Sequence, residues 1–107
     1  MSDWIEVCQV SECPPGASLE LVAADRVVAL YNIDGAFFAL DGVCPHQGGP
    51  LGKGQLDGCV VTCPWHGWQF DVRSGQHQLS ASVMQPTIPV RVEEKSVFVE
   101  RQRGTAT

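Results

Sequence analysis

A chain of 107 residues and 11.6 kDa has room for one domain with a single hydrophobic core. Twelve acidic and seven basic side chains give it a formal net charge of -5, which argues against nucleic acid or an anionic membrane as a partner. No run approaches the roughly 18 apolar residues of a membrane span. The first residues, Met1–Glu6, resemble no secretory signal. We therefore expect a cytoplasmic protein, too small for an enzyme with a separate substrate domain.

Short apolar runs bounded by turn residues recur along the whole chain and predict β-strands. Valine is the commonest apolar residue, with fourteen copies, and it favours pleated, half-buried surfaces. The dipeptide Asp34-Gly35 predicts a two-residue hairpin turn, and Asp57-Gly58, Arg73–Gly75 and Glu93–Lys95 predict further tight turns. The predicted fold is all-β, a small antiparallel sandwich or barrel. The predicted strands are Trp4–Val7, Leu19–Ala23, Val27–Ile33, Phe37–Leu40, Cys59–Thr62, Trp68–Val72, Ile88–Val92 and Val97–Val99.

A glycine-rich segment interrupts this pattern and contains the residues that can bind a metal. Eight of the eleven glycines lie between positions 42 and 75. Cys44 and His46 form a C-x-H motif, and after sixteen residues Cys63 and His66 form a C-x-x-H motif. The Asp57-Gly58 turn between the motifs can bring the two loops side by side. We take these four side chains as candidate metal ligands.

The cysteine count favours metal binding over a disulfide framework. Five cysteines is an odd number, and the chain shows no export signal. Cys8, Cys13 and Cys59 fit the role of small buried apolar residues. For the four candidate ligands, one tetrahedral zinc ion and a two-iron, two-sulfide cluster both remain open. The cluster is the better fit, because C-x-H is tighter than the usual spacing of zinc ligands.

The two motifs in their context, Cys-Pro-His-Gln-Gly-Gly and Cys-Pro-Trp-His-Gly-Trp-Gln-Phe-Asp, resemble those of Rieske-type [2Fe-2S] ferredoxins that serve bacterial ring-hydroxylating oxygenases. The resemblance implies a Rieske-type β-fold with a cluster-binding subdomain of two ligand loops. It implies one [2Fe-2S] cluster, with Cys44 and Cys63 on the inner iron and His46 and His66 on the outer iron. It also implies a third loop over the cluster, at 81–86.

Departures from the related respiratory proteins predict a low reduction potential. Those proteins have a disulfide between the cluster loops, and the corresponding residues here are Gly49 and Trp65. They also have a serine and a tyrosine that donate hydrogen bonds to sulfur, where this chain has Trp68 and Phe70. Such bonds stabilise the reduced cluster, so their loss lowers the potential. The remaining histidine, His77, is expected to be exposed at a strand end.

The resemblance implies an electron-transfer protein that is not itself an enzyme. It would be a monomer carrying one electron from a flavin-dependent NAD(P)H reductase to a terminal non-haem iron oxygenase, with transient docking, and neither nucleic acid nor membrane as a partner. The alternative is the small subunit of an NADH-dependent nitrite reductase or a similar oxidoreductase. Residues 1–107 are expected to form one domain, with a cluster-binding subdomain at about 42–80 and a disordered tail at about 101–107.

Overall fold

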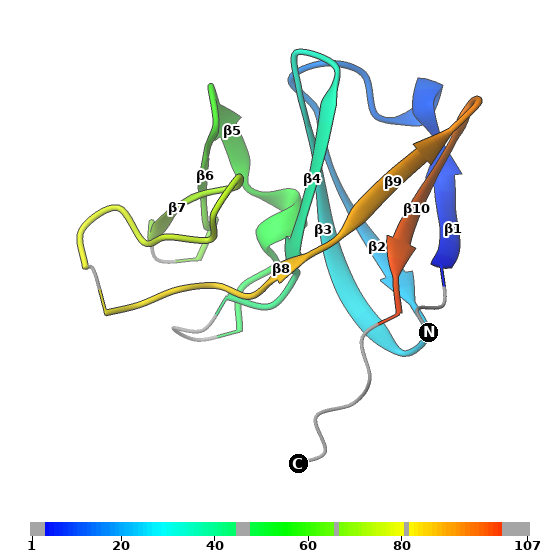
Figure 1. Cartoon of the computed structure of the whole chain (residues 1–107). Helices are drawn as coiled ribbons and strands as arrows, with labels where there is room; N and C mark the ends of the chain where they lie inside the picture. Colours follow the sequence, from blue (N-terminus) through cyan, green and yellow to red (C-terminus); the bar gives the residue numbers. More distant parts are fainter. Residues whose placement is uncertain (1–3, 45–47, 66, 81, 102–107) are drawn as a thin grey trace.

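The computed structural model describes residues 4–44, 48–65, 67–80 and 82–101, and their regular structure is almost entirely antiparallel β-sheet (Figure 1). This confirms the predicted all-β class. The first sheet has the order β1-β10-β9, with β1 at Trp4–Gln9, β10 at Ser96–Glu100 and β9 at Val90–Glu93. The middle sheet has the order β2-β3-β4-β8, with β2 at Ser18–Ala23, β3 at Arg26–Ile33, β4 at Ala36–Asp41 and β8 at Thr87–Ile88. The third sheet has the order β5-β6-β7, with β5 at Gln55–Asp57, β6 at Val60–Thr62 and β7 at Gln69–Asp71.

The middle sheet separates two hydrophobic cores, where the length of the chain had suggested one. Successive side chains of a strand point to opposite faces of the sheet. On β3, Val28 and Leu30 therefore enter the first core, whereas Ala29 and Tyr31 enter the second. The first core lies against the β1-β10-β9 sheet and consists of Cys8, Cys13, Ala23, Val28, Leu30, Ala39, Ile88, Val97 and Val99. The second core lies toward the third sheet and consists of Ala29, Tyr31, Leu40, Cys44, Leu51, Val61, Cys63, Phe70 and Val72.

Two-residue turns join most of the paired strands. Asp34 and Gly35 both have positive φ, 51° and 97°, as the predicted hairpin between β3 and β4 requires. Ala24 and Asp25 form an equivalent turn with φ of 50° and 72°, which the sequence did not predict because alanine seldom adopts this conformation. The turn after β5 is displaced by one residue from the prediction, because Asp57 still pairs with Val60.

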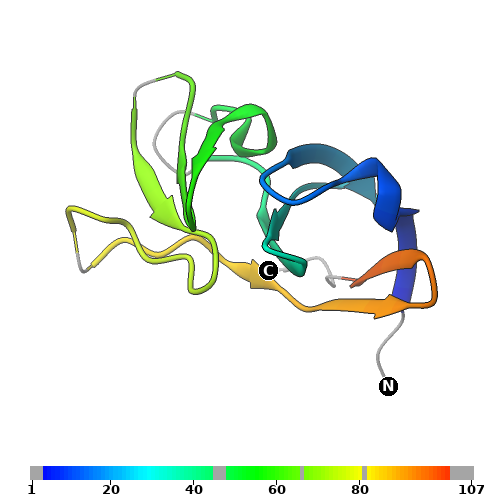
Figure 2. The same ribbon diagram turned by 90° about the horizontal axis from the view of Figure 1, so that it is seen from above.

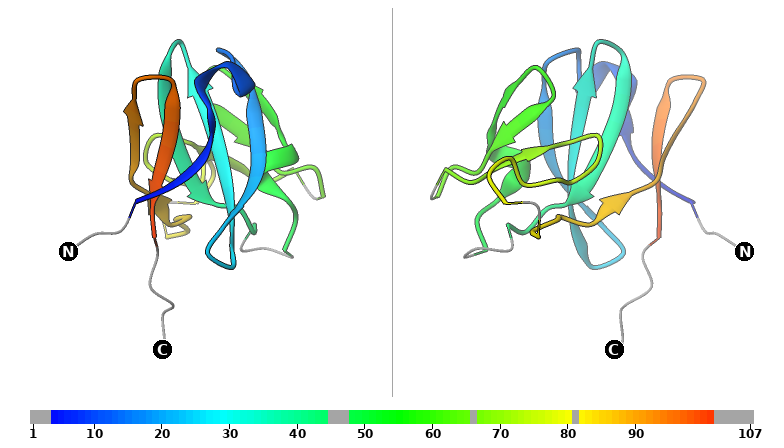
Figure 3. Two further views of the ribbon diagram at one scale, coloured as in Figure 1. Left: turned by 90° about the vertical axis from the view of Figure 1, so that its right-hand side faces the viewer. Right: turned by 60° about the vertical axis from the view of Figure 1, so that its left-hand side comes forward.

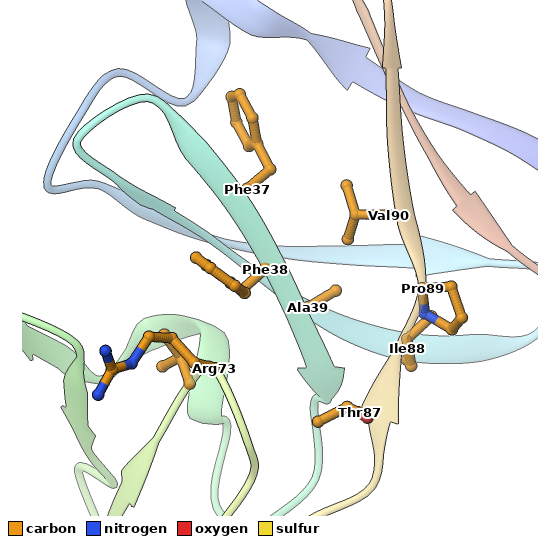
Figure 4. A pocket seen from close by; sticks show the side chains of 9 residues that line it. Phe37, Phe38, Ala39, Arg73, Thr87, Ile88, Pro89 and Val90 are labelled. Carbon is orange, nitrogen blue, oxygen red and sulfur yellow. The ribbon is translucent and has the colours of Figure 1, made fainter.

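The predicted strand Ile88–Val92 is two strands in the structure. Ile88 pairs with Ala39 of β4 in the middle sheet, whereas Val90 pairs with Val99 of β10 in the first sheet. Pro89 lies between them, and its nitrogen carries no hydrogen for a sheet. The chain changes sheets there, beside a shallow hollow of about 210 Å³ (Figure 4). Neither Cys44 nor Cys63 lines this hollow, whose described lining residues are Phe37, Phe38, Ala39, Val72, Arg73, Thr87, Ile88, Pro89 and Val90.

The third sheet lies at the opposite end of the molecule from the first sheet, as Figures 1 and 2 both show. The two views in Figure 3 show the first and last strands, β1 and β10, side by side. In the described residues no helix is long and apolar enough to cross a membrane. The described part of the chain has two single-turn 3-10 helices, at Val10–Glu12 and Leu51–Lys53. Of the predicted tail, only Arg101 is among the described residues, and it is exposed outside any strand.

Candidate metal centre

The segments that begin at Cys44 and Cys63 have the same backbone hydrogen bonds. In the Cys44 loop, residues 44–49, the Cys44 N–H donates to the Gly49 carbonyl at 2.8 Å and the Gly48 N–H donates to the Cys44 carbonyl at 2.9 Å. In the Cys63 loop, residues 63–68, the Cys63 N–H donates to the Trp68 carbonyl at 2.8 Å and the Gly67 N–H donates to the Cys63 carbonyl at 3.0 Å. The two loops are therefore built alike around their cysteines, although their histidines stand at different positions.

A close approach between the loops places both cysteines in one buried region. Cys44 is 2 % exposed and Cys63 is 3 % exposed, and both belong to the second core. A Cβ on Gly49 would lie 2.6 Å from the Cys63 sulfur, closer than real atoms approach. Only glycine therefore fits at this point of the Cys44 loop. The sequence prediction that the two loops lie side by side is confirmed for their cysteine ends.

The two predicted histidine ligands, His46 and His66, lie outside the described residues. In the described part of the chain, no three His, Cys, Asp or Glu side chains gather into a set that could hold a metal ion. Two buried thiols from two matched loops supply half of a four-ligand set. The assignment of all four ligands stays a prediction.

The segment that leads into the Cys44 loop is held by two polar side chains that the sequence analysis did not single out for this role. The Gln85 amide donates to the Asp41 carbonyl at 2.6 Å and to the Val43 carbonyl at 2.7 Å. The Asp41 carboxylate accepts a hydrogen bond from the Arg26 guanidinium at 2.9 Å and another from the Val43 N–H at 3.1 Å. The Asp41 side chain thus helps to fix the approach to Cys44. No local sequence signal marks Gln85.

Part of the predicted third loop lies against this segment. Val83 packs on the second core, and the Pro86 carbonyl accepts the Asp41 N–H at 2.9 Å. Ala81 is outside the described residues. The role of this loop as a cover for the centre stays a prediction.

Tyr31 contributes a buried hydroxyl to the second core, but that hydroxyl already has an acceptor. It donates to the Leu51 carbonyl at 2.9 Å. Burial, and after it the nearby Cys63, raises the pKa of Tyr31 well above its ordinary value. The hydroxyl has a single hydrogen to donate, so it is not available to a cysteine sulfur. Trp68 and Phe70 lack hydroxyls, as the sequence already showed.

The expectation that His77 is exposed was wrong. His77 is 7 % exposed, and its ring lies perpendicular to those of Trp68 and Phe70, with centroids 4.6 and 5.2 Å away. The reason is a β-bridge between Phe70 and His77, formed when the chain returns after the turn at Arg73–Gly75. Bridged residues point to the same face, so His77 follows Phe70 into the interior.

The other three cysteines lie away from the two loops. Cys8 and Cys13 belong to the first core, and burial raises the pKa of both thiols, that of Cys8 to about 11 with a further contribution from Cys13. Both are therefore poor metal ligands and poor nucleophiles, as expected of structural cysteines. Cys59 is only half-buried, and its sulfur lies 4.0 Å from an Asp71 carboxylate oxygen.

Comparison with known proteins decides between the two metals. A family model described as the Rieske [2Fe-2S] domain matches residues 3–89. This chain belongs to the Rieske [2Fe-2S] family. The predicted cofactor, one [2Fe-2S] cluster, is thereby confirmed over a zinc ion. The donor chemistry agrees, because Rieske centres take two cysteine thiolates on one iron and two histidines on the other.

Similar proteins of known role are ferredoxins of nearly the same length. The ferredoxin subunit of biphenyl dioxygenase from Pseudomonas sp. (strain KKS102) is 38% identical over 104 residues, which cover 94% of each chain. The ferredoxin component of the naphthalene 1,2-dioxygenase system from Pseudomonas aeruginosa is 33% identical over 99 residues, 91% of this chain and 94% of that one. The resemblance to this kind of Rieske ferredoxin is confirmed.

Two solved structures show the same fold. A structure titled as the complex of reduced oxygenase and oxidized ferredoxin in carbazole 1,9a-dioxygenase contains a chain with a TM-score of 0.83 and 31% identity, covering 91% of this chain and 92% of that one. A putative NADH-dependent nitrite reductase small subunit from Mycobacterium tuberculosis has a TM-score of 0.86 and 25% identity, covering 96% and 98%. The Rieske-type architecture is therefore confirmed.

Proposed function

We propose that this Rieske protein is the ferredoxin of an oxygenase system, a one-electron carrier between a flavin-dependent NAD(P)H reductase and a terminal non-haem iron oxygenase. The observation that carries the proposal is the pair of matched loops, with Cys44 and Cys63 buried in one core and with an exposed Trp65 in the Cys63 loop. Ferredoxin components of oxygenase systems, matched over nearly their full length, support it.

We propose Cys44 and Cys63 as ligands of the inner iron and His46 and His66 as ligands of the outer iron. The cluster supplies reversible one-electron chemistry, and the protein sets its access and potential. Because the sequence has three histidines, only His77 would remain for a second metal site. The mononuclear iron site of an oxygenase needs two histidines and a carboxylate, so the proposed role is electron transfer without catalysis.

Apolar side chains beside the loops suit a weak, transient docking surface. Trp65 is 57 % exposed, Met84 is 53 % exposed and Val43, which precedes Cys44, is 46 % exposed. We assign the docking surface to these three residues together with Pro86, which is also exposed. Lys53 and Asp57 are the only charged residues between Cys44 and His66, so apolar contact dominates there and distant acidic side chains affect mainly the association rate.

The test of docking is electron transfer to the oxygenase. Trp65→Ala should impair transfer at every ionic strength and leave the visible spectrum nearly intact, whereas added salt should slow transfer only moderately. Val22→Ala is a matched control, because Val22 is 71 % exposed on β2 of the middle sheet. Transfer that collapses in salt but tolerates Trp65→Ala would show that docking is driven by charge.

The test of the centre is its composition. The purified protein should contain two irons and two acid-labile sulfides per chain, and the reduced protein should give the electron paramagnetic resonance spectrum of mixed His/Cys ligation. One zinc and no sulfide would contradict the proposal. We further propose a single-domain monomer in the cytoplasm, with residues of about 42–80 forming the cluster-binding part.

The similarity to a nitrite reductase small subunit supports a second candidate function, that of a bound subunit in a larger oxidoreductase. The two functions differ in the behaviour of the isolated protein. A free carrier is stable alone, exchanges between reductase and oxygenase, and is bleached by the reductase. A subunit is stable only with its large partner.

A further inference from the structure

The ring of His77 has a defined tautomer. Its Nδ1 accepts the backbone N–H of Leu79 at 3.0 Å. A ring nitrogen that accepts a hydrogen bond carries no hydrogen, so the imidazole hydrogen is on Nε2. Among the described residues, this Nε2 is the one buried side-chain nitrogen or oxygen that has no hydrogen-bond partner.

A buried donor without an acceptor is costly. Leaving such a group unpaired removes its hydrogen bond to water without replacing it, and native proteins contain few such groups. The hydrogen bond from the Leu79 N–H and the perpendicular contacts with the rings of Trp68 and Phe70 hold the His77 ring in this orientation. An apolar residue of similar size would avoid the cost, so the presence of a histidine calls for a functional reason.

The two rings that His77 contacts belong to the surroundings of the proposed iron ligands. Phe70 lies in the same core as Cys44 and Cys63, and the Trp68 carbonyl accepts the Cys63 N–H at 2.8 Å. Trp68 and Phe70 carry no hydroxyl, and the buried Tyr31 hydroxyl donates its hydrogen to the Leu51 carbonyl. Among the described residues, the His77 Nε2–H is thus a buried polar hydrogen without an acceptor, beside two rings that border the proposed centre.

We propose that His77 raises the electron affinity of the centre through its Nε2–H dipole. The inference rests on the proposed cluster ligands. Two ferric ions, two sulfides and two thiolates sum to zero charge, and one added electron makes the centre negative. The proposal places the hydrogen end of the Nε2–H toward the centre, because a fixed dipole so oriented in a weakly screened interior favours the negative state. In this proposal His77 acts on the centre through its dipole, so it is a positioning residue for the potential.

The variant His77→Phe keeps an aromatic ring against Trp68 and Phe70 and removes the N–H. We expect its reduction equilibrium constant to fall two- to fivefold, which is a potential about 20 to 40 mV lower since about 59 mV corresponds to tenfold for one electron. His77→Gln restores an N–H donor on a chain of similar reach and should lie nearer to the native potential. Gln78→Ala, at an exposed neighbour, should leave the potential unchanged. Spectroelectrochemical titration at pH 7 measures all four proteins.

The outcomes separate the dipole from packing. An unchanged potential in His77→Phe, with iron and sulfide content intact, overturns the proposal. Equal falls in His77→Phe and His77→Gln also overturn it, because lost packing then explains both. If the Phe variant does not retain its cluster, nitrogen-15 NMR of the native holoprotein decides: hydrogen on Nε2 supports the proposal, and hydrogen on Nδ1 overturns it. The iron and sulfide content of the native protein tests the proposed cluster separately.

Discussion

The two cores on either face of the middle sheet are closed by different means. The first core is bounded by long strands: β2 and β3 pair at six positions, and β1 and β10 pair at five. The second core faces three strands of three residues each, with three paired positions between neighbours. Side chains bound to backbone carbonyls complete it, notably Tyr31 to Leu51 and Gln85 to Asp41.

This difference teaches that the two regions depend on different sources of stability. Regular pairing satisfies the backbone around the first core without help from a ligand. The second core includes Cys44 and Cys63, the two proposed cysteine ligands, so ligation of the cluster would be coupled to the folding of this core. We expect changes at the second core to affect both stability and cluster retention, and changes at the first core to affect stability alone.

The largest effect is expected from loss of a proposed ligand. Cys63→Ala should abolish the visible absorption and the iron content, and amide hydrogen exchange should speed up in β5, β6 and β7 while β3 stays protected. Cys13→Ala is the matched control, since Cys13 is a fully buried cysteine of the first core. A Cys63→Ala protein that kept two irons and two sulfides would contradict the ligand assignment.

A pair of leucines tests the two cores with the same chemistry. Leu30 of β3 and Leu40 of β4 are both 0 % exposed, but Leu30 lies in the first core and Leu40 in the second. Each replacement by alanine should lower the unfolding free energy by about 2–5 kcal/mol. Only Leu40→Ala should also speed the loss of iron to a chelator. Equal rates of iron loss in the two variants would show that the cores are not independent.

A hydroxyl added at Phe70 tests whether only the second core affects the reduction potential. Phe70 is 0 % exposed in the second core, and the resemblance to respiratory Rieske proteins implies a tyrosine that bonds to sulfur at the equivalent position. Rieske centres span about -150 to +300 mV, and we expect the native value near the low end. Phe70→Tyr should raise the reduction potential by tens of millivolts. About 59 mV corresponds to a tenfold change in the equilibrium constant for one electron. Phe37→Tyr, beside the first core, should change the potential little, and a native value in the upper half of the range would contradict the argument.

The smallest effect concerns an ion pair at the end of β7. The Arg73 guanidinium donates to the Asp71 carboxylate at 2.9 and 3.1 Å and holds the pKa of Asp71 below its ordinary value, against a smaller opposing effect of burial. A lowered pKa in the folded state stabilises the protein above the unfolded-state pKa of about 3.9, and this stability is lost as the pH falls through the folded value.

Removing this ion pair should therefore weaken resistance to acid. Arg73→Leu should move the midpoint of acid unfolding, followed by circular dichroism, to a slightly higher pH. The shift is small because Arg73 is largely exposed. Lys95→Gln, in the exposed turn between β9 and β10, is the control and should not move the midpoint. An unmoved midpoint in Arg73→Leu would mean that the pair adds nothing to stability.

Features of the fold that depend on near neighbours could be predicted from the sequence. Asp34-Gly35 specifies its turn because both positions need positive φ, and the short valine-rich runs specify strands by their alternation. The Ala24-Asp25 turn could not be predicted, because pairing of β2 with β3 imposes a conformation that alanine does not favour. The division of Ile88–Val92 was also missed, since each half pairs with a different sheet.

By itself, the sequence determined the chemistry of the centre: the C-x-H and C-x-x-H motifs, the glycines around them and the absence of hydroxyls at Trp68 and Phe70 are properties of neighbouring residues along the chain. Only the tertiary structure decided what depends on segments distant in sequence. It placed Gly49 against the Cys63 sulfur, gave the Tyr31 hydroxyl to Leu51, and put Gln85 on the approach to Cys44. It also turned His77 inward. Burial and hydrogen-bond partners result from how strands pair and sheets pack, and no local pattern records them.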